Sequence, residues 1–409
     1  MPTKMIMKYM LFLIITISTL CCCNSAKDKW GSKIIAFNLK QLPDISGLTL
    51  SDLGFKEIEY IPLETNEQSL LSSTEDLLLR HKILVNDRQI VIHRLNTILK
   101  FHSDGKFVTK IGSKGRGPDE FHHAHDVNIR ENTQDIYLLD RWNNKFLIYS
   151  EDGKLKRTFQ IQFSPNEFRF IGDKILCYSE NHMANIQDSY TLIDTNGTVI
   201  KTFPNKYPFK MKDGYGIEGE NLYYTFNNSL YKKEVYSDTI YEFDNECFTP
   251  HMVLQVGKKL LTTEARTQFD GRYLAKNYIM PLNLFEFGDY VYYEFIYKYV
   301  VPEEYEIPVD IKIYSFIGSK TNNFNALIET GTGLINDLDG GPNFLPRTIK
   351  NDNTIVGWIE PSKLKSHVAT DDFKKSVPKY PEKKQKLEKL ANSLKETDNP
   401  VLVMVSLKK

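Results

Sequence analysis

Apolar and polar residues alternate over much of this chain, and the alternation recurs with a long period. Residues 92–106 (IHRLNTILKFHSDGK) align without gaps on residues 140–154 (DRWNNKFLIYSEDGK), an offset of 48 positions. A weaker copy, residues 190–199 (YTLIDTNGTV), places Asn-Gly a further 44 positions along. Each copy has an alternating run, an Asp-Gly or Asn-Gly pair and another run, which predicts a β-hairpin with a type I′ turn.

Hairpins that recur at this spacing are typical of the four-stranded blades of a β-propeller. A single blade cannot bury both faces of its sheet, so neighbouring blades must stack around a common axis. Blades of about 45 residues, with insertions, would divide the mature chain into six to eight units, and we expect six. The predicted fold is therefore all-β, a six-bladed β-propeller of four-stranded antiparallel blades.

The C-terminal segment departs from this repeat. Residues 381–396 (PEKKQKLEKLANSLKE) begin with proline and place apolar side chains at helical spacing, which predicts an amphipathic helix. Residues 401–407 (VLVMVSL) are apolar enough for a strand buried on both faces. An open ring would leave an exposed sheet edge. We therefore expect 401–407 to close the ring in one blade with 56–63 (KEIEYIPL), and the helix to pack outside.

The N-terminus has the pattern of a secretory signal. Lys4 and Lys8 precede an apolar run at 9–20, which is too short to span a bilayer as a permanent helix. Three cysteines follow, and only Cys23 has a leucine three positions before it, as in a bacterial lipobox. We expect 1–23 to be signal peptide and lipobox, 24–32 a tether, and 33–409 the propeller. The alternative is an uncleaved anchor.

Several segments carry a family resemblance: 110–121 (KIGSKGRGPDEF), 61–71 (IPLETNEQSLL), 335–347 (INDLDGGPNFLPR) and 398–407 (DNPVLVMVSL). The first looks like the interblade segment of NHL-type propellers. As a set they resemble the six-bladed β-propeller lipoproteins of Bacteroidetes, over essentially the whole mature chain. The resemblance implies a lipid-anchored, extracytoplasmic protein of the cell envelope, held to the outer membrane at Cys23. It implies no particular enzymatic activity.

Charge and cysteine content narrow the functional classes. The chain has 52 basic and 52 acidic residues, and removing Lys4 and Lys8 leaves 50 against 52, or −2. Without a basic surplus we expect no nucleic-acid partner. Cys177 and Cys247 lie in strand-like runs and form no CxxC pattern, so buried thiols are favoured over a disulfide between them.

Histidines after the first interblade segment form the densest group of metal-capable side chains. His122, His123, His125 and Asp126 could supply three ligands to zinc. An axial site would need contributions from several blades, and the corresponding stretch at 164–175 (SPNEFRFIGDKI) has no histidine. We therefore predict no metal and no cofactor, and place His125 and Asp126 at the channel mouth as candidate ligand-binding residues.

Two further features suggest ligand contacts. Asn336, Asp337 and Asp339 precede a Gly-Gly pair, and their oxygens suit calcium or a glycan or peptide; side-chain turn chemistry is the alternative we favour. Trp142 aligns with a turn-side position, where it could stack on a sugar or pack at the rim. Gly115 and Gly117 are read as turn glycines rather than a phosphate loop, because no Gly-Lys-Ser/Thr follows.

No catalytic residues emerge from the sequence, since it has no Gly-x-Ser-x-Gly elbow and no His-Glu-x-x-His helix. We therefore expect a membrane-tethered binding or scaffold module for a glycan, peptide or protein partner. The alternative is a propeller enzyme, a metal-dependent lyase or hydrolase with its site at the central channel.

Overall fold

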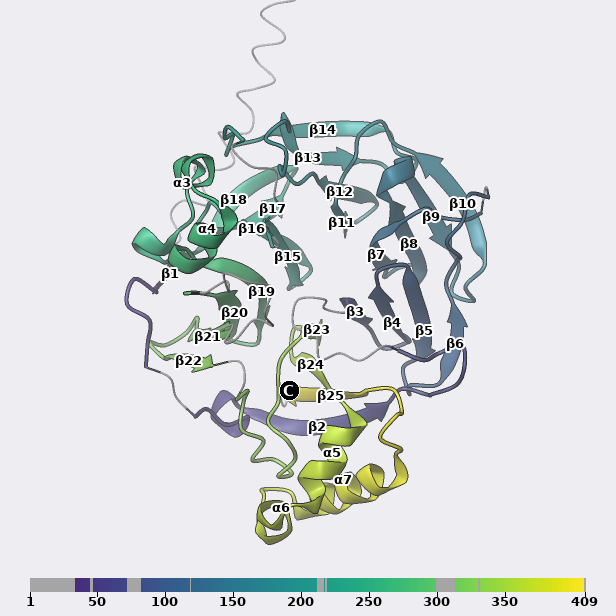
Figure 1. Cartoon of the computed structure of the whole chain (residues 1–409), viewed down its shortest axis with the longest axis vertical. Coiled ribbons are helices and arrows are strands. Elements are labelled where there is room, and N and C mark those ends of the chain that lie inside the picture. Colours follow the sequence, from purple (N-terminus) through teal and green to yellow (C-terminus); the bar gives the residue numbers. More distant parts are fainter. Residues whose placement is uncertain are drawn as a thin grey trace, which may run out of the picture.

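The computed structural model describes residues 34–44, 47–71, 82–117, 119–211, 217, 219–298, 313–329 and 332–407. Cys23 and the signal, lipobox and tether assigned to residues 1–32 lie outside these residues. Six sheets are arranged in a ring around a central channel, and the inner strand of each sheet faces the axis (Figure 1). The prediction of a six-bladed β-propeller is confirmed.

Each blade is named here from its inner to its outer strand. Blades 1 and 2 are β23 (Thr348–Asn351), β24 (Thr354–Ile359), β25 (Val401–Leu407) and β2 (Phe55–Pro62), then β3 (Lys82–Val85), β4 (Gln89–Arg94), β5 (Thr97–His102) and β6 (Phe107–Lys110). Blades 3 and 4 are β7 (Ala124–Arg130), β8 (Asp135–Asp140), β9 (Lys145–Tyr149) and β10 (Leu155–Gln160), then β11 (Glu167–Ile171), β12 (Lys174–Tyr178), β13 (Asp188–Ile193) and β14 (Val199–Pro204). Blades 5 and 6 are β15 (Asn221–Phe226), β16 (Ser229–Glu234), β17 (Thr239–Asp244) and β18 (Cys247–Gln255), then β19 (Met280–Phe287), β20 (Tyr290–Ile296), β21 (Ile313–Ser319) and β22 (Asn325–Glu329).

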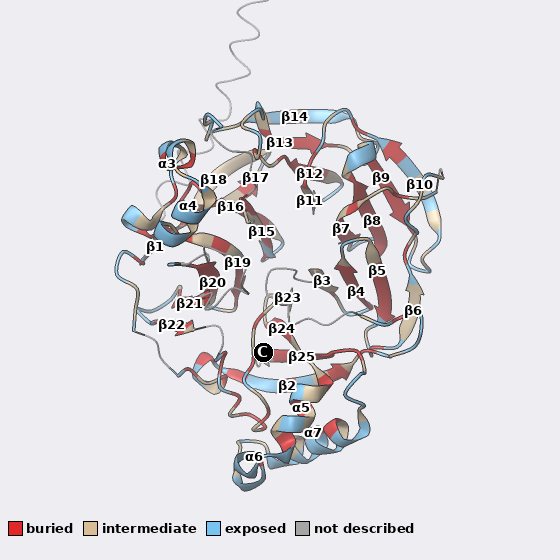
Figure 2. Ribbon diagram, viewed as in Figure 1, coloured by how far each residue is buried: buried red, intermediate tan, exposed pale blue. Residues whose placement is uncertain are grey.

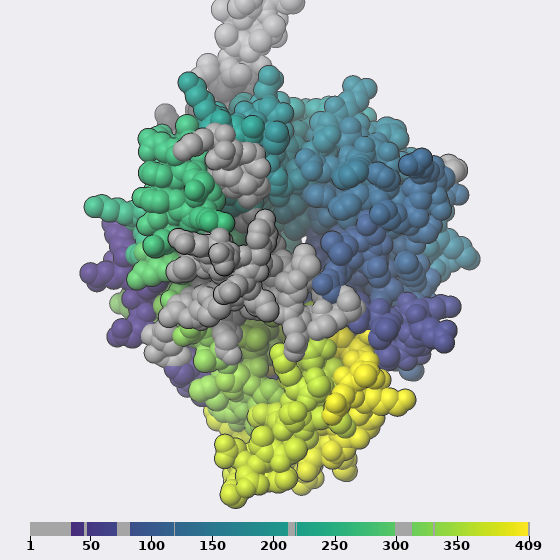
Figure 3. Space-filling view, viewed as in Figure 1, coloured from purple at the N-terminus to yellow at the C-terminus, as the bar shows by residue number. Residues whose placement is uncertain are grey.

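Blade 1 joins the two ends of the chain. β25 pairs antiparallel with β24 on one side and with β2 on the other, so the C-terminal strand closes the ring as predicted. The predicted helix is α7 (Pro381–Ser393), which ends three residues earlier than expected. It packs outside the ring with α5 (Pro361–Ala369) and α6 (Asp371–Lys375). Figure 3 shows this C-terminal group projecting from one side of the ring.

Alternation along the strands places the core between blades. In β8, Ile136 and Leu138 pack toward blade 2, while Tyr137 and Leu139 pack toward blade 4. Successive side chains of a strand point to opposite faces, so one central strand contributes to two interblade cores. Figure 2 shows that the middle strands of the blades are buried, whereas β14 is largely exposed at the outer edge and β2 has both buried and exposed residues.

The three predicted hairpins are present as the two outer strands of blades 2, 3 and 4, but their turns are not type I′. Only the glycines, Gly105, Gly153 and Gly197, have positive φ, at 88°, 81° and 91°. In blade 2 the Gly105 N–H donates to the His102 carbonyl, and the His102 N–H donates to the Lys106 carbonyl. This is a type I turn followed by a left-handed glycine, the common three-residue hairpin loop.

The glycine-rich segment after β6 also differs from expectation. Gly112 has positive φ, whereas Gly115 and Gly117 do not, so those two do not supply special turn angles. They instead leave space for Glu120: a Cβ at Gly115 would lie 1.9 Å from its carboxylate, and the Gly117 N–H donates to that carboxylate at 2.7 Å. The segment does connect blade 2 to blade 3.

Other elements were not predicted. β1 (Ile35–Asn38) pairs in parallel with β18, which gives blade 5 a fifth strand. The helices α3 (Thr263–Gln268) and α4 (Gly271–Asn277) lie between blades 5 and 6. Cys177 is buried, Cys247 is half-buried, and no disulfide joins them. Across the part of the chain that the structure describes, no helix has the length and apolar character needed to span a bilayer.

Candidate functional site

A cavity of about 880 Å³ occupies the channel and is lined by the inner strands of all six blades. The contributing residues lie in the later parts of β7, β11 and β15, along β23, and in the turns that follow these four strands, so the cavity sits at the carboxyl ends of these inner strands. We call it the central cavity. Its volume lies in the range of small-molecule sites, which are about 300–1,000 Å³.

Basic side chains outnumber acidic ones around the central cavity. The five basic residues are Lys82, Arg130, Arg169, Arg347 and Lys350, and the two acidic ones are Glu131 and Asp352. Asparagine amides and aromatic rings fill much of the remaining wall, including those of Asn128, Asn132, Asn228, Asn283, Tyr223, Phe285 and Trp358. The wall therefore combines positive charge, amide hydrogen-bonding groups and ring surface.

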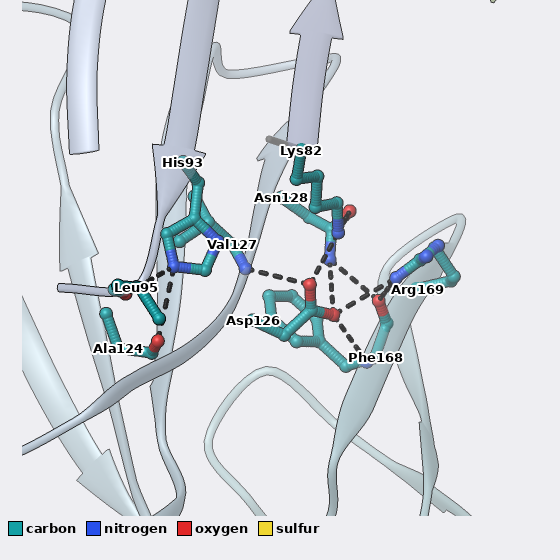
Figure 4. Close-up of polar contacts among 9 residues, drawn as sticks. All are labelled: Lys82, His93, Leu95, Ala124, Asp126, Val127, Asn128, Phe168 and Arg169. Atoms are coloured by element: carbon teal, nitrogen blue, oxygen red, sulfur yellow. Dashed lines mark hydrogen bonds and ion pairs between the residues drawn. The ribbon is translucent and has the colours of Figure 1, made fainter. Parts of the chain in front are cut away.

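The Asp126 carboxylate holds two of these basic groups in place (Figure 4). Lys82 Nζ lies 2.5 Å from Asp126 Oδ1, and Arg169 Nη1 lies 3.1 Å from Oδ2. The backbone N–H groups of Val127 and Phe168 donate to the same carboxylate, each at 3.0 Å. Strands of blades 2, 3 and 4 are thus joined through one buried carboxylate.

Electrostatics keeps this network charged. Burial alone would raise the pKa of Asp126, but the charges of Lys82 and Arg169 and the hydrogen bonds lower it to about 2. Burial and the neighbouring Arg169 lower the pKa of Lys82 to about 8, against the opposing attraction of Asp126. At neutral pH the network therefore has two cations on one carboxylate, and it leaves positive charge at the cavity wall.

The second ligand-binding candidate on β7, His125, lies at the opposite end of the channel. Its Nε2 is 3.4 Å from the Asn166 amide nitrogen, and burial together with the charge of Arg141 lowers its pKa to about 4. His125 is therefore neutral in ordinary buffers. Neither of the residues predicted as ligand contacts on β7 faces the central cavity directly: Asp126 acts on it through Lys82 and Arg169.

Four residues at this end of the channel form a group that the sequence did not reveal: His125, Glu180, His182 and Glu220. We call this group the histidine end. His182 Nε2 lies 3.1 Å from a Glu180 oxygen and 3.6 Å from a Glu220 oxygen. Burial raises the pKa of Glu220 to about 7, so this carboxyl exchanges a proton near neutrality. The members of the histidine end come from the β12–β13 loop and from the starts of inner strands. No local sequence motif links these residues.

Trp142 lies in the short helix η2 (Arg141–Asn143) between β8 and β9, and it is 66% exposed. The His123 ring stacks on it at 5.9 Å, and the His122 ring meets it edge-on at 4.9 Å. The predicted turn-side placement is therefore what the structure shows. Over the described ranges, no group of three or more His, Cys, Asp or Glu side chains is arranged to hold a metal ion.

The acidic turn lies away from the channel. The Asn336 amide donates to Asp339 at 2.7 Å, and the Gly341 N–H donates to the same carboxylate at 2.9 Å. Asp337 pairs with Lys379 at 3.2 Å and accepts hydrogen bonds from Ser51. These contacts tie the loop before β23 to Ser51 and to the C-terminal segment, and burial raises the pKa of Asp339. Asn336, Asp337 and Asp339 therefore make their contacts within the protein.

Comparison with known proteins gives the family. The sequence profile of a domain of unknown function (DUF4934) matches residues 34–406. The chain belongs to the DUF4934 family. No protein with a curated description matches it.

Solved structures resemble this DUF4934 chain in fold. A Bacteroides fragilis protein assigned as exported is 18% identical with a TM-score of 0.66, covering 92% of this chain and 100% of its own. A Bacteroides vulgatus protein of the DUF4221 family is 11% identical (TM-score 0.49, 87% and 97% covered), and the Staphylococcus aureus virginiamycin B lyase is 12% identical (TM-score 0.37, 86% and 99% covered). At these identities the likeness concerns the fold alone.

Proposed function

We propose that this protein is an extracytoplasmic binding module, anchored by a lipid on Cys23, whose central cavity binds an acidic oligosaccharide. The observation that carries the proposal is the composition of the cavity wall: five basic side chains against two acidic ones, contributed by strands that all converge on one axis. Cavities lined by one sign of charge concentrate ligands of the opposite sign.

The other wall residues favour a sugar over a simple anion. Amide side chains donate to and accept from hydroxyl groups, and aromatic rings such as Tyr223 and Trp358 offer flat surface for the apolar face of a sugar ring. Arginine forks bind carboxylates with two parallel hydrogen bonds. Arg130 lies at the end of β7 and lines the cavity, where its guanidinium could form such a pair with a ligand.

Calorimetric titration of the purified full chain tests the proposal, with a short oligogalacturonate and a neutral maltooligosaccharide of equal length as probes. We expect the acidic probe to bind, the neutral one not to bind, and added salt to weaken binding. Arg130→Gln should weaken binding by about tenfold or more, since one charge-assisted hydrogen bond is lost.

Arg116→Gln is the matched control, because Arg116 is exposed in the β6–β7 loop and does not line the cavity. It should bind as the unaltered protein does. Equal binding of both probes, or equal loss in both variants, would contradict an acidic-sugar site in the channel. Failure of every acidic oligosaccharide, with binding of an acidic peptide instead, would replace the sugar by a peptide.

A further inference from the structure

A second cavity lies between blades 4 and 5, apart from the channel. Its volume is about 420 Å³, and its walls come from β13, β14, β16, β17 and β18 and adjoining residues. It shares no lining residue with the central cavity. Irregular pairing accompanies it, because the β13–β14 and β17–β18 ladders both contain register shifts. Bulges bend strands away from their neighbours, which opens space at the blade junction.

A buried cation lines this interblade cavity. Lys232 is 2% exposed and forms an ion pair with Glu234, two positions along the same strand. Its ammonium lies over three aromatic rings, at 4.6 Å from Tyr190, 4.9 Å from Tyr241 and 4.8 Å from Phe248. A charge in such surroundings is stable only when it is paired and hydrogen-bonded.

The hydrogen-bonding capacity of Lys232 is not used up. An ammonium has three N–H donors. Within the described ranges, Glu234 is the one hydrogen-bond acceptor that Lys232 has. Two donors therefore remain at a buried site that borders empty space, where an oxygen atom of a ligand would complete their hydrogen bonding.

A second ammonium lies close by. Lys206 also borders the cavity, and its Nζ is 5.2 Å from the centroid of the Tyr241 ring that Lys232 contacts. Burial lowers the pKa of Lys232; Glu234 opposes that shift and the charge of Lys206 adds to it. Lys232 and Lys206 thus repel one another, and the anion of a ligand between them would relieve that repulsion.

Much of the remaining wall is apolar and aromatic, and Lys201, Asp244 and Asn245 also border the cavity. Phe203 and Phe248 meet at 5.0 Å between ring centroids, Tyr190 lies 4.9 Å from Phe248, and Pro204 completes this side. Ring edges and faces of this kind pack well against another ring. The cavity therefore combines the ammonium groups of three lysines and two carboxylates with a cluster of aromatic rings.

We propose that the interblade cavity is a binding site for a small aromatic carboxylate, with its carboxylate on Lys232 and Lys206 and its ring against Phe203 and Phe248. The site is independent of the acidic-sugar proposal for the channel, so either can fail alone. The cavity volume lies within the range of small-ligand sites and is too small for a folded partner.

Fluorine NMR with 4-fluorobenzoate tests this site on the full chain. We expect a saturable change in the probe's shift or line width, and clearly weaker binding of the neutral analogue 4-fluorobenzamide. The double variant Lys232→Met/Glu234→Gln removes the pair without leaving a buried charge alone. It should reduce probe affinity about tenfold or more, since a charge-assisted hydrogen bond is lost.

Lys233→Met is the matched control. Lys233 is the next residue of β16, is equally buried at 2% exposure, and lies over Tyr293 rather than the interblade cavity. This variant should bind the probe as the unaltered chain does. Thr249→Phe supplies a second route, because Thr249 lines the cavity and a ring there would fill it while the ion pair stays intact.

The outcomes are distinct. Loss of binding in both cavity variants and not in Lys233→Met supports the site. No saturable binding to the unaltered chain, binding that survives in both cavity variants, or equal binding of benzoate and benzamide would each overturn the proposal and leave Lys232–Glu234 as a structural ion pair. Binding of an oligogalacturonate in the channel does not depend on any of these results.

Discussion

At the scale of single residues, Asp126 has the most far-reaching contacts around the channel. It accepts from Lys82 of blade 2 and from Arg169 of blade 4, which lie 44 and 43 positions away in sequence. The sequence suggested Asp126 as a ligand contact at the channel mouth, since a carboxylate beside histidines has that appearance. Its cationic partners were not predictable, because no local pattern states which distant residues share a channel.

Asp126→Asn should destabilise the protein by about 2–3 kcal/mol, because two half-buried cations lose the buried carboxylate that pairs with them. The depressed pKa of Asp126 sets the pH dependence. Its stabilising effect is complete above the unfolded-state pKa near 3.8 and is lost as pH falls toward the folded value of about 2. Urea unfolding at pH values below the range in which Lys82 loses its proton should therefore show the difference from the unaltered protein constant above about pH 4 and shrinking below it.

Asp173→Asn is the control for this measurement, since Asp173 is exposed on the β11–β12 turn. It should leave the free energy of unfolding nearly unchanged, as surface substitutions usually do. A difference for Asp126→Asn that stays constant down to pH 2 would show that the carboxylate charge is not what stabilises the network.

At the scale of elements, strand pattern and turn residues predicted the hairpins, the terminal helix and the closing strand. What remained hidden depended on contacts between blades. β1 adds in parallel to β18, more than 200 positions away, and α3 and α4 fill a junction between two blades. The hairpin glycines are a further example. Their need for positive φ could be predicted from the sequence, whereas their packing on the preceding blade could not.

Gly105 packs against the preceding blade so closely that a Cβ there would lie 2.2 Å from the Pro62 carbonyl oxygen. Gly105→Ala should therefore cost the left-handed strain of about 1–2 kcal/mol and a further loss from moving blade 2 away from blade 1. Gly172→Ala is a matched control, since Gly172 also has positive φ, at 56°, but no atom lies within 4 Å of its added Cβ. We expect denaturant unfolding to show the larger loss for Gly105→Ala, and equal losses would mean that the blade contact contributes nothing.

At the scale of the whole molecule, stability depends on a closed ring. Each blade buries its faces against two neighbours, so removing one strand exposes apolar surface on both sides of a junction. The sequence predicted this closure because 401–407 is apolar on both faces. It could not predict the central cavity, which forms only when six strands distant in sequence converge and their carboxyl ends meet.

Ending the chain at Asn399 should remove this closure. β25 lies between β24 and β2, and its Val401, Leu402 and Val405 are fully buried. Each lost side chain corresponds to about 1.5–3 kcal/mol of burial, so the sum is comparable with the stability of a typical domain. We expect the shortened chain to be insoluble or to melt far below the full chain in circular dichroism.

A synthetic peptide of residues 400–409 should raise the melting temperature of the shortened chain by pairing between β24 and β2, as donated strands do in other sheets. A scrambled peptide should not. If the shortened chain melts like the full one, the ring does not depend on β25, and the apolar pattern of 401–407 would need another explanation.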